Sequence, residues 1–534
     1  MPYIAPNSTV EFFGNLGLND NYDDSLYFAS ESAKNAYFTA TQKLATCVSM
    51  TYTREQRGYI RVELNIGDII GASYMRYKNT NFENKWFYAF VKNVEYINNK
   101  CTQVNFELDP LMTWMGTFAL NECFIERQHT IHDYIGSNVA DERLDTGEYV
   151  CQGTSKTERF NDYSIVVFQA SNEAGEPIGL LFGGIFSGLY MYYAEDEHGE
   201  PETVENSVGA IKDYLERMIT GHRSDEIIAI QMLPKHFIPD RHSGSSSPTL
   251  DRFSITKPYT NFSYPAPVGE TNTYTPRNKK LFTYPYNFLL VYNSEGQYAE
   301  YKYEYFNSVP DTESTGQAWF TLRGNCNIRS EISLIPEGYR GIQLDIAQRL
   351  SITNFPMCSW GVDTYRAYLA QVESSMPFKD IAFSAQAGIG LLTGNPFMSL
   401  GAIAGKVGSV YSLLAQESIH PSIPNQVRGI QGQDLMLALK TKDFYFYRMC
   451  INKSYAIMLD DYFDQYGYAI REHGIPNMNA RPYWTYVKTV GCSVEGNIPA
   501  DDASAIEKIF NNGIRFWKNH TQIGNYSLNN APND

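Results

Sequence analysis

Cysteine is scarce in this sequence, with eight residues in 534, and no two of them form a C-x-x-C pair. A disulfide scaffold or a structural zinc site needs a denser and more regular cysteine pattern, so the sequence excludes both classes. We expect free thiols in a protein that is assembled in a cytosol. The N-terminus, Met1 to Gly14, lacks a cationic stretch followed by an apolar core, so no signal peptide is predicted.

Basic residues are also in short supply, since 43 Lys and Arg stand against 59 Asp and Glu, for a net charge of −16. A protein that holds nucleic acid by its phosphates would carry the opposite balance, so that class is excluded. An acidic surface does not exclude passing contact with DNA, because a wall that repels phosphate lets a duplex slide. The simpler alternative is that the charge serves solubility.

Catalytic and cofactor-binding patterns are missing as well. The run Gly401–Val407 has the wrong glycine spacing for a phosphate-binding loop, and Val407 stands where a Ser or Thr must hold magnesium. His129 and His132 lie on an expected strand, where their spacing sends them to opposite faces. We interpret the adjacent carboxylates Asp460 and Asp461 as a solvated face, not as a glycosidase pair. The sequence therefore predicts no enzyme, no metal site and no cofactor.

Aromatic residues are abundant, with 40 Tyr and 30 Phe, while hydrophobic residues make up 43% and charged residues 19% of the chain. This balance is globular, and the length predicts two or more domains. Short alternating runs rich in aromatic residues favour strands over helices, so the expected fold class is mainly β. The expected strands are 58–64, 85–91, 102–108, 124–129, 163–168, 227–233, 287–292, 299–305 and 444–455.

Two helices are expected, one inside a central α+β insertion and one near the C-terminus. Val208, Ile211, Leu215 and Met218 recur at helical spacing, and Gly221 is a plausible end of that helix. The second helix is predicted over 502–517, with its apolar face formed by Ile506, Ile509, Phe510 and Ile514. We predict a tube-forming β domain over 1–130, the inserted α+β domain over 131–270, a second tube β domain from 271–371 and 427–534, and a hydrophobic loop over 372–426.

The segment Ile381–Gly405 does not fit a soluble β protein, because it contains no charged residue over 25 positions. It is long enough to cross a bilayer as a helix, but Pro396 and six glycines over Gly388–Gly408 interrupt a single helix. Four interpretations compete: a permanent membrane anchor, a buried core hairpin, a disordered linker, and a membrane-active loop that is shielded in an oligomer and released later. The predicted membrane-active residues are Phe378, Ile381, Phe383, Ile389, Leu391, Leu392, Phe397, Met398, Leu400, Ile403, Val407, Val410, Leu413 and Leu414.

Several stretches at both ends of the chain share their order and spacing with one protein family. They are 84–91, 104–109, 113–115, 466–468, 486–489, 509–514 and 523–527. They resemble the tail knob, or distal tube, proteins of small picovirus-type (Salasmaviridae-like) short-tailed phages of Gram-positive bacteria. That family also carries a Gly/Ala-rich hydrophobic insertion where this chain has Val372–Gln426, which is shorter and has Pro421 and Pro424 near its exit.

The resemblance implies a virion protein at the tail tip that is assembled in the host cytoplasm as a hexameric, mostly β tube. Its expected partners are further copies of itself, the other tail proteins of the lower collar or proximal tube, the host membrane after loop release, and DNA in transit through the lumen. The hydrophobic loops would plug the lumen before infection and line a membrane channel afterwards. The alternative functions are a tail-tip cell-wall hydrolase and a receptor-binding module.

Overall fold

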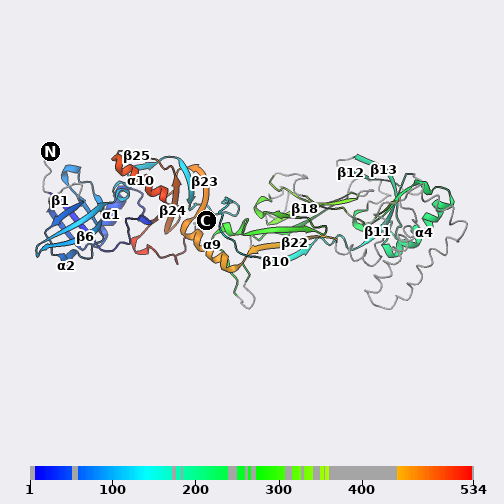
Figure 1. Cartoon of the computed structure of the whole chain (residues 1–534), viewed down its shortest axis with the longest axis horizontal. Helices are drawn as coiled ribbons and strands as arrows, with labels where there is room; N and C mark the ends of the chain where they lie inside the picture. Colours follow the sequence, from blue (N-terminus) through cyan, green and yellow to red (C-terminus); the bar gives the residue numbers. More distant parts are fainter. Residues whose placement is uncertain are drawn as a thin grey trace, which may run out of the picture. The chain divides into compact units, whose positions relative to one another are not determined.

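The computed structural model divides the chain into two compact units, each built from segments that are distant in the sequence (Figure 1). Unit 1 contains residues 1–148, 263–286 and 451–534, and unit 2 contains 149–262 and 287–450. All fourteen residues of the predicted membrane-active loop lie outside the described part of the chain. The structure describes residues 7–50, 58–170, 176–181, 185–238, 249–258, 263–265, 272–306, 316–325, 330–340, 349–353, 355, 357–359 and 442–531.

The N-terminal part of unit 1 is an antiparallel sheet in the order β3-β1-β5-β6-β7-β4. Successive residues point to opposite faces of a strand, so Phe12 and Met75 enter one apolar cluster while Phe13 and Tyr74 enter another. The sheet is thus buried on both faces where these four residues lie. Its strands are β1 (Ser8–Phe13), β3 (Ala45–Met50), β4 (Tyr59–Val62), β5 (Tyr74–Lys78), β6 (Phe87–Asn98) and β7 (Cys101–Leu108).

Three short helices accompany this sheet: α1 (Glu31–Ala40), α2 (Ile66–Ile69) and α3 (Pro110–Trp114). Helix α1 begins at Ser30, whose side chain accepts from the Ala33 amide, and α3 begins at Asp109, which accepts from the Met112 amide. The buried Lys34 of α1 donates from Nζ to the Met112 carbonyl at 2.7 Å and to the Met115 carbonyl at 3.0 Å. A lysine of one helix therefore satisfies carbonyls at the end of another.

The second sheet of unit 1 joins both ends of the chain, in the order β2-β26-β24-β9-β23. Strand β2 pairs in parallel with β26, and the other pairs are antiparallel. A two-stranded ribbon, β8 with β25, continues beside it. The strands are β2 (Asp24–Leu26), β8 (Phe118–Leu120), β9 (Cys123–Gln128), β23 (Tyr468–Gly474), β24 (Trp484–Val490), β25 (Val494–Gly496) and β26 (Ile514–Trp517).

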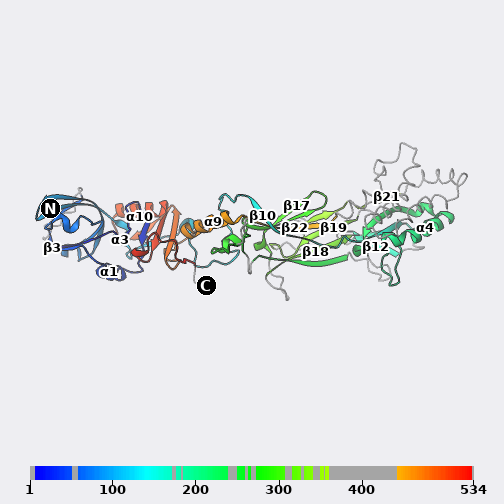
Figure 2. The ribbon, with the colours of Figure 1, turned by 90° about the horizontal axis from the view of Figure 1, so that it is seen from below.

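The predicted C-terminal helix is shorter than expected. Helix α10 (Ala500–Asn512) ends at Gly513, whose φ of 94° is accessible mainly to glycine, and the chain continues as strand β26. Ile506, Ile509 and Phe510 are buried on the helix as predicted, and α10 contacts β24. It also contacts α3, which lies beside it in Figure 2. The assignment of Ile514 to the helix was wrong, because Ile514 begins the strand that pairs with β24.

The described residues of unit 2 form three sheets. The first has the order β10-β22-β16-β17, the second β12-β13-β11-β14-β21, and the third β15-β18-β19-β20. The strands are β10 (Tyr149–Lys156), β11 (Tyr163–Gln169), β12 (Glu176–Leu181), β13 (Ile185–Tyr192), β14 (Ile227–Pro234), β15 (Thr249–Thr256), β16 (Asn287–Asn293), β17 (Tyr298–Tyr301), β18 (Gln317–Asn325), β19 (Glu331–Pro336), β20 (Leu350–Ile352), β21 (Met357–Ser359) and β22 (Phe444–Ile451).

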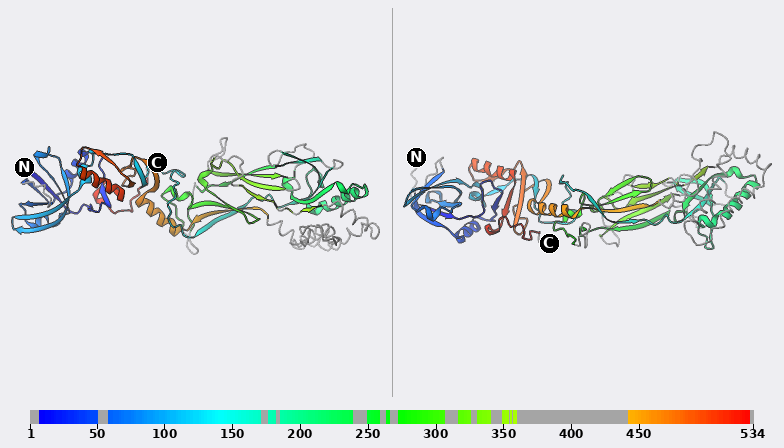
Figure 3. Two further views of the ribbon diagram at one scale, coloured as in Figure 1. Left: turned by 45° about the horizontal axis from the view of Figure 1, so that its top comes forward. Right: turned by 60° about the horizontal axis from the view of Figure 1, so that its bottom comes forward.

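Helix α4 (Val204–Thr220) confirms the predicted helix of the central region. Its buried residues include Ile211, Leu215 and Met218, and Gly221 caps its end. It packs on β11 of the second sheet, where the views of Figure 3 show it in green. Strands β10, β14 and β15 of the predicted insertion pair with β22, β21 and β18, which follow it in the sequence. The predicted domain boundaries themselves stay a prediction.

The described elements are mostly strands with few helices, arranged in more than one compact unit, so the expected fold class of a mainly β, multidomain protein is confirmed. Two predicted strands end four residues early. The strand expected over 299–305 stops at Tyr301 and continues as a 3-10 turn, Tyr303–Tyr305. The strand expected over 444–455 stops at Ile451, because a helix begins at Lys453.

Candidate functional site

A polar cluster in the described part of unit 1 is built on helix α9 (Lys453–Tyr466), which the sequence analysis missed. The Asn452 side chain accepts from the Ser454 amide at 2.7 Å and starts the helix. The helix ends at Gly467, where φ is 64° and the amide donates to the Phe463 carbonyl. Its buried stripe is Ala456, Leu459, Asp460 and Phe463, so a carboxylate lies within an otherwise apolar face.

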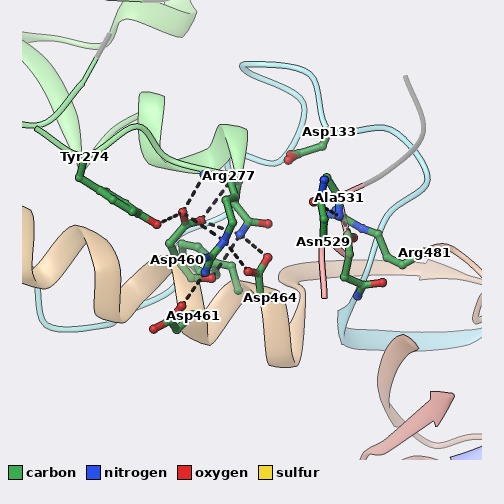
Figure 4. A network of polar contacts seen from close by, with 12 residues as sticks. Asp133, Tyr274, Arg277, Asp460, Asp461, Asp464, Arg481, Asn529 and Ala531 are labelled. Carbon is green, nitrogen blue, oxygen red and sulfur yellow. Dashed lines mark hydrogen bonds and ion pairs between the residues drawn. The ribbon is translucent and has the colours of Figure 1, made fainter. Parts of the chain in front are cut away.

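Asp460 is fully buried and accepts hydrogen bonds on both oxygens from the segment 274–278 (Figure 4). The Tyr274 hydroxyl donates at 2.5 Å and the Arg277 amide at 2.7 Å to one oxygen. The Asn278 amide at 3.0 Å and its side-chain Nδ2 at 2.6 Å donate to the other. The interpretation of Asp460–Asp461 as a solvated face was therefore wrong for Asp460, while Asp461 is 54% exposed.

Arg277 spans the neighbouring carboxylates of the same helix. Its guanidinium contacts Asp461 at 2.5 Å and Asp464 at 2.7 Å (Figure 4). Burial alone would lower the pKa of Arg277, but the three carboxylates of Asp461, Asp464 and Asp460 raise it above its usual value. Burial also raises the pKa of Asp464, although Asn278 donates to it at 2.8 Å. The cluster keeps an arginine charged beside an acidic helix.

Further hydrogen bonds and ion pairs connect this cluster to the segment 133–142. The Tyr468 hydroxyl lies 2.7 Å from Asp133 and 2.9 Å from Asn278, and the Lys279 amide donates to Asp133 at 2.9 Å. Lys280 is buried and pairs with Glu142 at 2.5 Å. Burial lowers the pKa of Lys280, and the Glu142 carboxylate opposes that shift. Glu142 is also bonded to Arg127, so it has two cationic partners.

This arrangement is suited to fastening three chain segments and not to catalysis. Both oxygens of Asp460 are occupied by donors from the protein, which leaves no lone pair directed at a substrate. A buried carboxylate with such partners is stabilised only while all of them are in place. The segments 133–142, 272–283 and 453–464 are held together here, each close in sequence to a point where the chain passes between unit 1 and unit 2.

The two histidines singled out in the sequence lie in different environments. His129 is buried just after β9, where Nδ1 accepts from the Tyr486 amide at 2.8 Å and Nε2 lies 3.2 Å from the Phe463 carbonyl. Burial, followed by the charge of Arg481, holds the pKa of His129 well below its usual value. His132 is exposed and stacks on Tyr134. Within the described ranges, no group of three His, Cys, Asp or Glu side chains is placed to hold a metal ion.

Sequence reasoning missed Tyr274, Arg277, Asn278 and Asp464 as members of this cluster. The available signal was the spacing of Ala456, Leu459, Asp460 and Phe463, which is that of one helical face and includes a carboxylate.

Six cysteines in the described residues are free thiols: Cys47, Cys101, Cys123, Cys151, Cys450 and Cys492. Among the helices that the structure describes, none combines the length and the apolar character needed to cross a bilayer.

Two family models match separate stretches of the chain. Residues 6–119, which contain the N-terminal six-stranded sheet, match the N-terminus of caudoviral major tail proteins. Residues 243–531, more than half of the chain, match the C-terminal domain of tail knob protein gp9 of Bacillus phage phi29. The chain belongs to the phage tail knob protein family. The resemblance inferred from the sequence is confirmed, and the chain is a structural component of the virion tail tip.

Relatives of the tail knob family align over the full length of the chain. Tail knob protein gp9 of Bacillus phage B103 is 24% identical over 606 aligned positions, covering 99% of this chain and 100% of that protein. The same protein of Bacillus phage PZA is 25% identical with equal coverage. The solved structure of the bacteriophage C1 tail knob protein, gp12, has the same fold with a TM-score of 0.57, 15% identity, and coverage of 98% of this chain and 99% of that one.

Proposed function

We propose that this tail knob protein forms a closed, six-subunit tube whose hydrophobic segments plug the lumen and, on infection, enter the host membrane as a channel for genome ejection. The observation that carries the proposal is the uncharged stretch Ile381–Gly405 in a protein of the virion tail tip. Leu391, Leu392, Phe397 and similar side chains would each cost about 1.5–3 kcal/mol to expose to water. Copies that meet inside a tube bury these side chains against one another, and lipid later replaces those partners.

The position of the segment in the chain supports this proposal. The last residue described before it is Ser359 of β21, and the first after it is Lys442, just before β22. Both strands belong to sheets of unit 2, so the sheets continue without the segment between them. Glycines within the segment allow two backbone arrangements, and Lys406 can extend its charged end to a headgroup region.

Closure into a ring is supported by the sheet edges. In the described part of unit 1, β3 and β4 form the two edges of the six-stranded sheet, and each pairs with one strand only. Exposed strand edges favour pairing with another chain, and cyclic symmetry is the common way to cover them in a homo-oligomer. We further propose that the lumen is acidic or neutral, because the net charge of −16 leaves few cations to hold DNA phosphates. The other tail proteins would bind one end of this tube.

The test is deletion of Val372–Gln426 with a short Gly/Ser bridge. Rings seen by negative-stain electron microscopy, together with loss of dye leakage from liposomes, are expected. A length-matched variant with Leu391→Glu, Leu392→Glu and Phe397→Glu separates apolar character from length, and it should also lose leakage. Failure of the deletion variant to assemble would mean that the segment is ordinary core. Equal leakage without the segment would place the membrane activity elsewhere.

Receptor binding is a second candidate function, favoured by exposed tyrosines on the first sheet of unit 2. Tyr292 is 37% exposed and Tyr298 is 61% exposed, with their ring centres 5.5 Å apart. Tyrosines in such positions are typical of binding surfaces, because the ring gives contact area and the hydroxyl gives a hydrogen bond. The double variant Tyr292→Ser, Tyr298→Ser should still bind host cell walls if the tube and pore function is the main one. Loss of wall binding with intact rings would favour the receptor function.

A further inference from the structure

Cys123 and Cys492 come from two chain segments that run side by side in unit 1. Phe124 of β9 pairs with Val490 of β24, and Leu120 of β8 pairs with Val494 of β25. Between these pairs, the Asn121 amide donates to the Ser493 carbonyl at 3.0 Å. The pairing register is therefore the same on both sides of these residues. It places Cys123 opposite Gly491, the residue next to Cys492.

A regular ladder would send these two side chains to opposite faces, because residues one position apart in register alternate. Gly491 breaks the alternation with a φ of 70°, a conformation that suits glycine. Cys123 and Cys492 are both buried as a result, with 3% and 6% of their surface exposed. The Cys492 amide also donates to the Asn511 side chain at 3.1 Å, which fixes the backbone at this position.

The two thiols lie close enough for each to affect the pKa of the other. Burial raises the pKa of both, that of Cys492 to about 12, and the neighbouring Cys492 partly offsets the rise at Cys123. Cys123 is therefore the sulfur better able to ionise, and Cys492 is the neighbour in position to react with it next.

We propose that Cys123 and Cys492 are an oxidation site, reduced while the protein is made in the host and converted to a disulfide by a small peroxide after the virion is released. Cys123 as thiolate attacks one oxygen of hydrogen peroxide, and the other oxygen leaves as hydroxide, which takes up the proton lost from the thiol and becomes water. Cys123 is then a sulfenic acid. The Cys492 sulfur attacks that sulfur, a second water leaves, and one disulfide has formed from two thiols and one peroxide.

The site is selective for a small oxidant because both sulfurs are buried. Hydrogen peroxide is close in size to water, whereas a bulky disulfide such as oxidised glutathione would have to open the sheet first. The cross-link would join residues far apart in the sequence, so it restricts the unfolded chain strongly. We expect the melting temperature of unit 1 to rise by about 5 °C on oxidation. The inference rests on the tail-tip location of the protein and not on the proposed pore.

The experiment is peptide mapping of the full-length protein, purified reduced and then treated with a small excess of hydrogen peroxide. Trypsin releases Cys123 in the peptide 101–127 and Cys492 in the peptide 489–508. Mass spectrometry without reduction should find these two peptides joined, with the loss of two hydrogen atoms. A Cys101→Ser background makes the assignment unique, because Cys101 lies in the same peptide as Cys123.

Two variants sharpen the test. Cys492→Ser should abolish the cross-link and leave a sulfenic acid at Cys123 that dimedone traps, and it should lose the rise in melting temperature. Cys47→Ser removes another buried thiol and should leave the cross-link unchanged. Recovery of the two wild-type peptides separately, each with an intact thiol after peroxide treatment, would overturn the proposal, as would a disulfide from Cys123 to any other cysteine. Neither result depends on the variants folding, and neither bears on pore formation.

Discussion

Asn278 donates twice to one oxygen of Asp460, from its side chain at 2.6 Å and from its backbone at 3.0 Å. A single asparagine thus fixes both the position of the segment before β16 and the rotamer of a carboxylate on α9. The remaining oxygen of Asp460 takes its hydrogen bonds from Tyr274 and the Arg277 amide. The stability of unit 1 should therefore depend much more on Asp460 than on the carboxylate next to it.

Asp460→Ala should lower the free energy of unfolding of unit 1 by about 3–5 kcal/mol, because it leaves several buried donors without an acceptor. Asp461→Ala is the matched control, since this neighbour is 54% exposed and has one ion pair with Arg277, and it should cost about 1 kcal/mol or less. Thermal and chemical denaturation followed by circular dichroism measure both. Equal effects of the two substitutions would contradict the assignment of the cluster as a structural fastening.

Gly467→Ala should be among the most damaging single substitutions in unit 1, at roughly 3 kcal/mol or more. Its φ is 64°, and an added Cβ would lie 2.4 Å from the backbone of Gln128. Gly524→Ala is the control, because Gly524 has a φ of 83° but nothing within 4 Å of the added atom. That control should cost only about 1 kcal/mol. Similar melting temperatures for the two variants would show that the contact with β9 relaxes easily.

Lys34 should make unit 1 more stable as the pH rises from about 8 toward 10.5. Burial lowers the pKa of Lys34 to about 8 from its usual 10.5, so in this window the unfolded chain binds a proton that the folded chain does not. The free energy of unfolding then increases with pH, by at most about 1.4 kcal/mol per pH unit. Urea titrations of wild type and Lys34→Met at several pH values measure the difference.

The variant Lys34→Met should lose this increase, while Lys43→Met, which removes a more exposed lysine beyond the same helix, should keep it. The comparison with wild type is needed because buried tyrosines affect stability in the opposite direction above pH 10. Burial raises the pKa of Tyr88 to about 12, for example, so above pH 10 the folded chain keeps a proton that the unfolded chain loses. The free energy of unfolding then falls as the pH rises. A parallel pH dependence for wild type and Lys34→Met would contradict this prediction.

The pure protein should not cleave peptidoglycan. The carboxylate pair that best matched a glycosidase in the sequence contains Asp460, whose two oxygens are occupied by donors of the protein itself. A zymogram with host cell walls is the measurement. A clearing zone that disappears on substitution of one carboxylate would overturn the prediction and restore the hydrolase alternative.

Local sequence patterns predicted much of the secondary structure. The alternation in 102–108 and the spacing of Ile211, Leu215 and Met218 gave the correct elements, because each of these segments buries one face. The apolar run 287–292 gave a strand that is buried over most of its length. The helix at 453–466 was missed because its stripe includes Asp460, and a carboxylate in an apolar face looks like a break. The end of α10 was misplaced because Ile514 continues the helical spacing, and only the φ of Gly513 redirects the chain.

The candidate site could not be assembled from the sequence, because its members come from segments around 133, 277 and 460. Tyr274, Arg277 and Asn278 have no periodic pattern, and their role depends on a distant helix, where they donate to the side chain of Asp460. The tail knob resemblance was recognisable from short stretches at the two ends of the chain. Buried residues of both sets of stretches belong to one apolar cluster of unit 1, which explains why packing constraints act on both of them together.

The parallel pairing of β2 with β26 has a consequence for biosynthesis. Asp24 pairs with Arg515 and also accepts from the indole of Trp517 at 2.7 Å. Strand β2 therefore cannot pair until β26, nearly the last segment to be synthesised, has left the ribosome. At a translation rate of ~5–20 residues per second, that delay is on the order of half a minute or longer. Unit 2 is synthesised completely within this interval. Prematurely terminated chains can never close the sheet, and the cell's proteases can remove them before they compete for places in a growing particle.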